Sequence, residues 1–514
     1  MMPGTERRMG PLNPKLNHTG CATSQTGRFL LALVLPASLA VILGLGRICS
    51  GARHFFSHPM HHDDYQFLAF RIFDWQFPYV RPVSRVLIGL LSPLGYETMI
   101  IVMYALLAVY AYLSLAFVLG LFEGRMSPGK VVLLGILLCV SPVLFWYQTY
   151  LGVITSLSSG VLGAAALYLF LRAAKSGRRC FRCGAILCLA LSAFAKEDFV
   201  LPSMAFLACC LLWRNKLVAG CGSDRRVPWS LAVAVAILAA LFLYNRSLDS
   251  PFTTGSSEAY RIATTFQDII RGFGIYLIGE VGTLCALVMA FILATAGAVV
   301  RPSSRSTFVI RAAACLAILL AMILPYALLP EHTYKYYSFM WYVWICSFVI
   351  VCAAVTRREI PGRSGRITAT AVFIAMMAAF CAFTFHQGGI ARRWHENQSE
   401  INIAMMRTLE QLRASLAGEA IVGVYNPPML SPWSNNNGQY LHRISKFENR
   451  WVVFVEEQSA SFQFSPDMTT PGTLITVLDA KRVCDVPGMK IIRFDAQGNG
   501  DLLRDCHAVR VEKK

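Results

Sequence analysis

The sequence predicts an all-α polytopic membrane protein of about eleven transmembrane helices, followed by a small C-terminal extracytoplasmic α/β domain. Three observations predict this fold class. The 514 residues are 55% hydrophobic and 15% charged, and the mean hydropathy is +0.51, which is too apolar for a soluble protein of this length. Basic residues cluster in every second connector between apolar runs. Beyond about residue 386 the composition becomes that of a soluble domain.

The N-terminal segment 1–28 is polar and basic, and we expect it to be a cytoplasmic tail. The apolar run from Phe29 to about Leu45 is long enough to span the bilayer. A cleaved signal peptide is the alternative, but no clear small-residue cleavage site is present and many apolar runs follow, which favours an uncleaved anchor. The transmembrane domain is therefore expected over 29–386.

Further apolar runs of spanning length follow this anchor. They lie near 97–121, 131–147, 152–173, 184–195, 199–213, 229–246, 273–299, 308–329, 337–355 and 367–386. The run 184–195 is short, so the segment around Lys196 could instead be a re-entrant hairpin. With an odd number of spans and a cytoplasmic N-terminus, the tail 387–514 is expected outside the cytoplasm.

The formal net charge of +18 could suggest a nucleic-acid partner. The lysines and arginines, however, sit in short connectors between apolar runs, where the positive-inside rule places them. The charge therefore reports topology, and we predict no nucleic-acid binding. The less basic connectors 49–96, 195–199, 247–272 and 330–336 are then expected to face outward.

The tail has the pattern of a small α/β domain. A helix is expected from Glu396 to Leu416, where apolar residues recur at helical spacing, followed by short β-type runs at 420–425, 451–455, 473–478 and 489–494. Most cysteines lie in apolar runs, where they act as small hydrophobic residues. Cys484 and Cys506 share a polar segment and are the plausible disulfide if the tail is extracytoplasmic.

Asp63 and Asp64 in the first outward loop are the candidate catalytic residues. Apolar residues at helical spacing predict an interfacial helix over 65–75, which places both acids at its amino end. One of them could simply cap that helix. Two acids are more than a cap requires, and a carboxylate near an attacking hydroxyl can accept its proton.

His61 and His62 precede these acids and, with them, could bind a divalent metal ion. The spacing selects no particular metal, and histidines in loops are more often solvated or interfacial. A metal ion is therefore kept as a possible cofactor without a defined ligand geometry.

Several charged residues near the expected outer surface are candidates for substrate binding. Arg81 and Arg85 could contact lipid phosphate from the interface or bind a substrate phosphate through their planar guanidinium groups. The hairpin Lys196-Glu197-Asp198 could be a solvated turn, but charges so close to apolar runs favour a polar cavity. The connector that contains His332, Tyr334 and Lys335 supplies cationic and hydroxyl donors at the membrane surface. An aromatic belt would explain the tyrosines, whereas Lys335 is expected to contact a lipid phosphate.

The order of these features resembles the GT-C superfamily of polytopic glycosyltransferases that use polyprenyl-phosphate-linked sugars, which includes protein O-mannosyltransferases and bacterial lipid-modifying enzymes. The resemblance rests on four short motifs spread over most of the membrane part: His62-Asp63-Asp64-Tyr65, Arg81-Pro82-Val83-Ser84, Lys196-Glu197-Asp198 followed by Leu201-Pro202, and Tyr334-Lys335-Tyr336.

This resemblance implies an inverting transfer on the outer face of a bacterial inner (cytoplasmic) membrane. Asp63 or Asp64 would deprotonate an acceptor hydroxyl, and cationic groups such as Arg81, Lys196 and Lys335 would hold the polyprenyl phosphate. Relatives often carry arginine where Lys335 stands, so its role is open. The implied partners are a polyprenyl-phosphate-linked sugar, an unknown acceptor and membrane lipid. A transporter or flippase of lipid-linked glycans, or a non-catalytic envelope-assembly scaffold, is the alternative.

Overall fold

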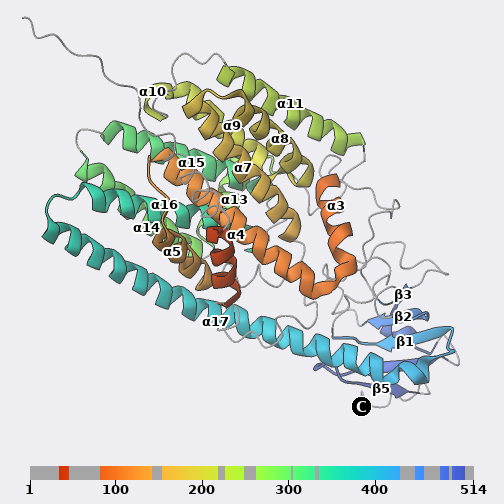
Figure 1. Cartoon of the computed structure of the whole chain (residues 1–514). Helices are drawn as coiled ribbons and strands as arrows, with labels where there is room; N and C mark the ends of the chain where they lie inside the picture. The colour runs from red at the N-terminus through yellow and green to blue at the C-terminus, as the bar shows by residue number, and fades with distance from the viewer. Residues whose placement is uncertain are drawn as a thin grey trace, which may run out of the picture.

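The computed structural model describes residues 34–45, 81–141, 153–217, 226–247, 262–279, 281–301, 305–329, 335–428, 441, 446–455, 475–484 and 489–503. These residues form a helical bundle and a small β-sheet, and one long helix, α17, connects the two (Figure 1). The predicted all-α membrane part and the C-terminal sheet are therefore confirmed. The predicted tail 1–28 lies outside the described residues, and of the predicted anchor only residues 34–45 are described, as a helix.

Within the described part of the chain, six helical segments are long and apolar enough to cross a membrane, so the predicted count of about eleven spans is not supported. They are Pro82–Leu121, Val153–Ser176, Gly282–Val300, Arg305–Ala327, Phe339–Glu359 and Arg363–Gly389. Several predicted spans form helices that are shorter or less apolar, namely α5 (Pro128–Cys139), α8 (Arg179–Ala195), α9 (Val200–Leu212) and α11 (Arg226–Ser247). A helix of about 12 residues covers only about 18 Å, less than the bilayer core.

The predicted span 273–299 is divided into two helices. α13 (Phe266–Leu277) is amphipathic and begins at Thr265, whose side chain caps the helix by accepting from the Asp268 N–H. α14 (Val281–Val300) is apolar throughout. Because the region is apolar throughout, the sequence did not show where the amphipathic helix ends and the membrane-length helix begins.

The remaining helices complete the bundle. α3 (Pro82–Leu91) and the 3-10 turn η1 (Ser92–Leu94) lead into α4 (Gly95–Leu121), and Gly95, with φ of 86°, permits the bend between α3 and α4 (Figure 1). The others are α7 (Val153–Ser176), η2 (Glu197–Phe199), α10 (Arg214–Leu217), α15 (Arg305–Ala327), η4 (Lys335–Ser338) and α16 (Phe339–Glu359).

The bundle is organised around α16. This helix is the most buried of the six candidate spans, and Trp341, Tyr342 and Trp344 are among the largest fully buried side chains of the described chain. α16 packs against α4, α5, α14 and α15, while α4 and α8 pack on α7. Since α16 is apolar on all sides, its burial by other helices is what its composition predicts.

α17 (Arg363–Leu416) runs uninterrupted for 54 residues along the bundle and into the sheet domain (Figure 1). The predicted boundary at 386/387 and the separately predicted helix Glu396–Leu416 both fall inside it. No proline interrupts the sequence between the two parts, so nothing ends the helix where it leaves the apolar region.

The sheet has five strands in the order β3-β2-β1-β4-β5. β1 (Ile421–Tyr425), β2 (Arg450–Val455), β3 (Ile475–Asp479) and β4 (Lys490–Phe494) pair in parallel, and β5 (Gly500–Leu503) is antiparallel to β4. The first four confirm the predicted β-type runs. α17 packs against the sheet through buried residues such as Met405 and Leu409, and the backbone N–H of Gly500 donates to Thr408.

Candidate functional site: a buried charge cluster at one end of the bundle

The charged hairpin lies where α8 ends and α9 begins. Lys196 has an extended backbone (φ −168°, ψ 148°), which ends α8, and Glu197 to Phe199 then form the turn η2. Lys196 and Asp198 point inward and are 2% and 3% exposed, whereas Glu197 is only partly buried. The hairpin is therefore not a solvated turn, and two of its charges need partners inside the bundle.

The Lys196 amine has three polar partners. Nζ donates to Ser156 Oγ at 2.6 Å and to Tyr326 OH at 2.8 Å, and it lies 3.4 Å from Asp198 Oδ2. The ring of Tyr337 covers the amine, with its centroid 4.1 Å from Nζ. Because an ammonium group has three N–H donors, Lys196 can contact a ligand directly only by giving up one of these interactions.

Asp198 completes a compact polar triangle with Lys196 and Tyr326. The hydroxyl of Tyr326, near the end of α15, donates to Asp198 Oδ1 at 2.5 Å, while Oδ2 faces the lysine. Burial lowers the pKa of Lys196 to about 8, against the opposing effect of Asp198. Burial likewise raises the pKa of Asp198. Since pH 7 is below this pKa of Lys196, the amine keeps its positive charge at that pH.

Arg81 and Glu197 form the accessible part of the same cluster. Arg81 Nη2 lies 2.9 Å from Glu197 Oε1, and the side chains are 23% and 29% exposed. Burial alone would raise the pKa of Glu197, but the charges of Arg81 and Lys196 outweigh it and lower that pKa. The result is an ionised carboxylate and a guanidinium group that can both be reached from outside the bundle.

Serine hydroxyls hold the hairpin backbone in place. Ser84 of α3 donates to the Ala195 carbonyl at 2.7 Å, and Ser159 of α7 donates to the Lys196 carbonyl at 2.7 Å. Carbonyls at a helix end have no partner within the helix, so these two hydroxyls satisfy the end of α8. They also fix the hairpin to two neighbouring helices.

Close packing of η2 against α7 fixes the hairpin further. A Cβ at Gly163 would lie 2.1 Å from Cγ of Phe199, far below any van der Waals contact. Phe199 is fully buried and packs edge-on against Tyr110, with the ring centroids 5.8 Å apart. Only a glycine at position 163 therefore lets η2 approach α7 this closely.

Of the predicted site residues, the structure brings together Arg81, Lys196, Glu197 and Asp198. Arg85 lies one turn further along α3 and is partly buried. Lys335 opens η4, which contacts α7 and α16 and contains Tyr337. The segment of Lys335 therefore reaches the Lys196 hairpin through Tyr337. The candidates Asp63, Asp64, His61, His62, His332 and Tyr334 lie outside the described residues.

Ser156, Tyr326 and Tyr337 are site residues that the sequence analysis missed. Tyr326 follows Pro325 near the end of an apolar run, a position at which an interfacial aromatic residue is ordinary. Its only distinguishing signal is a hydroxyl one residue after a proline inside an otherwise apolar helix. Contacts between residues 130 positions apart, as for Lys196 and Tyr326, carry no local sequence signal.

The opposite end of the bundle is rich in arginine. Arg311, which is 7% exposed, pairs with Glu123, and Arg301 pairs with Glu359. Lys175 donates to the Gly120 carbonyl at 2.5 Å. Residues 339 and 357 of α16 mark the two ends and are separated by roughly 27 Å along the helix, close to the thickness of a bilayer core.

The described residues contain no group of three or more His, Cys, Asp or Glu side chains placed to hold a metal ion. Cys484 is disulfide-bonded, and Cys506, its predicted partner, lies outside the described residues. The other cysteines that the structure describes form no disulfide bond.

Searches against protein-family models and curated protein sequences give no match to the chain.

Proposed function

We propose that this chain is a membrane glycosyltransferase. It moves a sugar from a polyprenyl-phosphate-linked donor to an acceptor hydroxyl on the outer face of the membrane, with inversion. The observation that supports this most directly is the cluster of Arg81, Lys196, Glu197 and Asp198, gathered from separate elements at one end of a membrane-length bundle. Charged groups in such a position are costly and typically mark a site for a polar substrate.

The cluster has two layers that suit different roles. The buried layer of Lys196, Asp198 and Tyr326 is held together by contacts within the protein, so we assign these residues to positioning. The accessible layer of Arg81 and Glu197 is available to substrate. The Arg81 guanidinium suits a phosphate group, and Glu197 can accept a hydrogen bond from a sugar hydroxyl.

In the proposed reaction, a carboxylate of Asp63 or Asp64 accepts the proton of the acceptor hydroxyl. The acceptor oxygen forms a bond to the anomeric carbon as the bond from that carbon to the phosphate oxygen breaks, and polyprenyl phosphate leaves with both electrons. Arg81 stabilises the negative charge that develops on the leaving phosphate. Asp63 and Asp64 precede Arg81 on the same predicted connector, which supports a shared site.

Two further observations support an outward-facing site. The bundle end remote from the cluster carries most of the arginines, as expected for a cytoplasmic side. Cys484 in the C-terminal domain is disulfide-bonded, which suits an oxidising compartment. Both favour a C-terminal domain that lies outside the cytoplasm.

The test is donor turnover by the full-length protein in proteoliposomes that contain a panel of polyprenyl-phosphate sugars and a crude envelope extract as acceptor. Release of free polyprenyl phosphate is measured for the wild type, Asp63→Asn and Asp64→Asn. Asp268→Asn is the matched control, because Asp268 is an acid on α13 outside the cluster. Loss of a general base is expected to slow turnover by at least about 100-fold in one of the two variants.

Equal turnover in Asp63→Asn, Asp64→Asn and the wild type would argue against the enzyme. Translocation of labelled donor across the proteoliposome membrane without release of polyprenyl phosphate would instead establish a flippase. The absence of both activities, with the protein correctly folded, would leave the envelope scaffold as the better assignment.

A further inference from the structure

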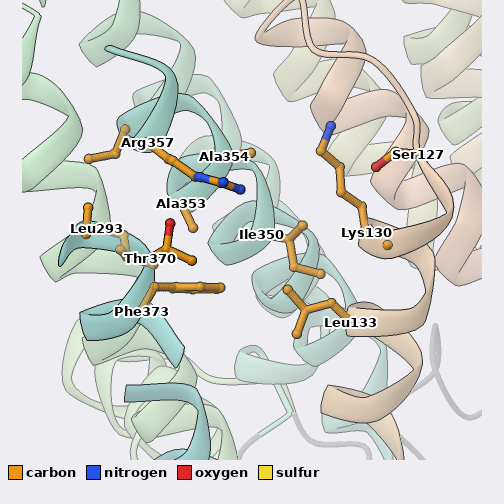
Figure 2. Close-up of a pocket in the computed structure, with 13 residues that line it drawn as sticks. Ser127, Lys130, Leu133, Leu293, Ile350, Ala353, Ala354, Arg357, Thr370 and Phe373 are labelled. Atoms are coloured by element: carbon orange, nitrogen blue, oxygen red, sulfur yellow. The ribbon is translucent and has the colours of Figure 1, made fainter. Parts of the chain in front are cut away.

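A pocket of about 320 Å³ lies at the arginine-rich end of the bundle, between α5, α14, α16 and α17 (Figure 2). It is remote from the Lys196 cluster, since α16 reaches the pocket near Arg357 and the cluster near its first residues. Its lining includes Ser127, Lys130, Leu293, Ile350, Thr356, Arg357, Thr370 and Phe373.

Two cations and the hydroxyls of Ser127 and Thr370 give this pocket a polar mouth. Lys130 comes from α5, Arg357 comes from α16, and Thr370 comes from α17. The Lys130 amine also donates to the Arg125 carbonyl, which leaves it two further N–H donors. Arg357 makes no ion pair with any described residue, whereas Arg301 at the end of α14 is paired with Glu359. The guanidinium of Arg357 is therefore available for an anion.

The amino end of α5 adds to the positive potential. Ser127 is its N-cap residue, yet the Ser127 side chain caps no backbone N–H, and Pro128 has no N–H. Gly129 lines the pocket, and a side chain there would meet open space. The first turn of this 12-residue helix therefore presents its dipole to the pocket without obstruction.

The other side of the pocket is apolar. Figure 2 shows Leu133, Ile350 and Phe373 on the opposite side from the Arg357 guanidinium, with the Thr370 hydroxyl between the two regions. α17, which supplies Phe373, is the least buried of the candidate spans, so this side is open to lipid. A free phosphate would leave the apolar part unfilled, whereas a lipid fills both.

We propose that this pocket binds one anionic phospholipid. Its phosphate contacts Arg357 and Lys130, and the first part of its acyl chain packs on Ile350, Leu133 and Phe373. Charge complementarity favours an anionic lipid over a zwitterionic one. The site is independent of the proposed transferase reaction, because none of its residues belongs to the Lys196 cluster.

Native mass spectrometry of the full-length protein in detergent, with equimolar phosphatidylglycerol and phosphatidylcholine, tests this proposal. The wild type should retain one phosphatidylglycerol in preference. Arg357→Gln should weaken its binding by at least about tenfold, because a hydrogen bond to a charged group is lost. Arg358→Gln is the matched control, since Arg358 is the next residue on α16 but does not line the pocket.

Equal retention of the two lipids, or equal loss in Arg357→Gln and Arg358→Gln, would overturn the proposal. Displacement of phosphatidylglycerol by millimolar inorganic phosphate would overturn it in favour of a soluble phosphate ligand. If Arg357→Gln fails to fold, as judged by its melting temperature, Lys130→Gln serves in its place, and unchanged lipid binding in Lys130→Gln would equally overturn the proposal.

Discussion

Replacing Lys196 with methionine should destabilise the protein mainly through the partner that it leaves behind. Methionine keeps most of the apolar stem, but Asp198 then becomes a buried carboxylate with no cation beside it. The two side chains are 3% and 5% exposed and their charged atoms lie 3.4 Å apart. At an effective dielectric constant of about 20, that separation corresponds to about 5 kcal/mol of attraction.

The desolvation of both charges offsets much of this attraction, so the pair as a whole contributes little, while breaking it is costly. We expect Lys196→Met to reduce the free energy of unfolding by about 3 to 5 kcal/mol. Adding Asp198→Asn should recover at least about 2 kcal/mol. Asparagine keeps an oxygen that can accept from the Tyr326 hydroxyl, so only the charge is removed.

The assay is a double-mutant cycle on the free energy of unfolding in detergent, measured by denaturant titration of the wild type, both single variants and the double variant. A double variant as unstable as the sum of its single changes would refute the reasoning, because it would show that Lys196 and Asp198 do not interact. Equal stability of Lys196→Met and the wild type would refute it as well.

Three further predictions test other parts of the site. Gly163→Ala should destabilise the protein by at least about 2 kcal/mol, because the new methyl group overlaps Phe199. Gly160→Ala should cost less, since its new methyl group first meets the flexible end of Met340. A comparison of the melting temperatures of the two variants tests this difference. Arg81→Gln should change stability by at most about 1 kcal/mol, because its ion pair is partly exposed, yet it should lower donor turnover; similar losses of both would contradict a substrate-binding role. Mass spectrometry of a non-reduced digest should find the peptide of Cys484 linked to that of Cys506, and a free Cys484 thiol would count against an outward C-terminal domain.

Hydropathy predicted the long helices well but not their number. The predicted runs near 152–173, 308–329 and 337–355 match α7, α15 and α16 closely, because each is an apolar run of membrane length. α5 and α9 are also apolar but are only 12 and 13 residues long, and hydropathy alone does not show where such a helix ends inside a bundle. The strand β5 was missed, since its four residues are too few to show alternation.

The sequence was sufficient to predict which charged residues belong to the site. Lys196, Glu197 and Asp198 stood out because ionised residues rarely follow an apolar run without a structural or functional reason. Which of them would be buried was not predictable, because that depends on the extended backbone of Lys196 and on Tyr326, far away in the sequence. The pocket near Arg357 gave no sequence signal either, since Arg357 and Lys130 looked like ordinary topology determinants.

Because α17 is uninterrupted, it fixes the rotation of the sheet domain about the helix axis relative to the bundle. One inserted residue in the exposed middle of a helix turns everything beyond it by about 100°, whereas seven residues complete nearly two turns and mainly add about 10 Å of length. A single insertion between the bundle and the sheet should therefore point a different face of the sheet toward the membrane. The number of residues in the helix therefore determines which face of the sheet points toward the membrane. Deletions and insertions in this stretch rotate the sheet domain, whereas in a flexible linker they would only change its reach.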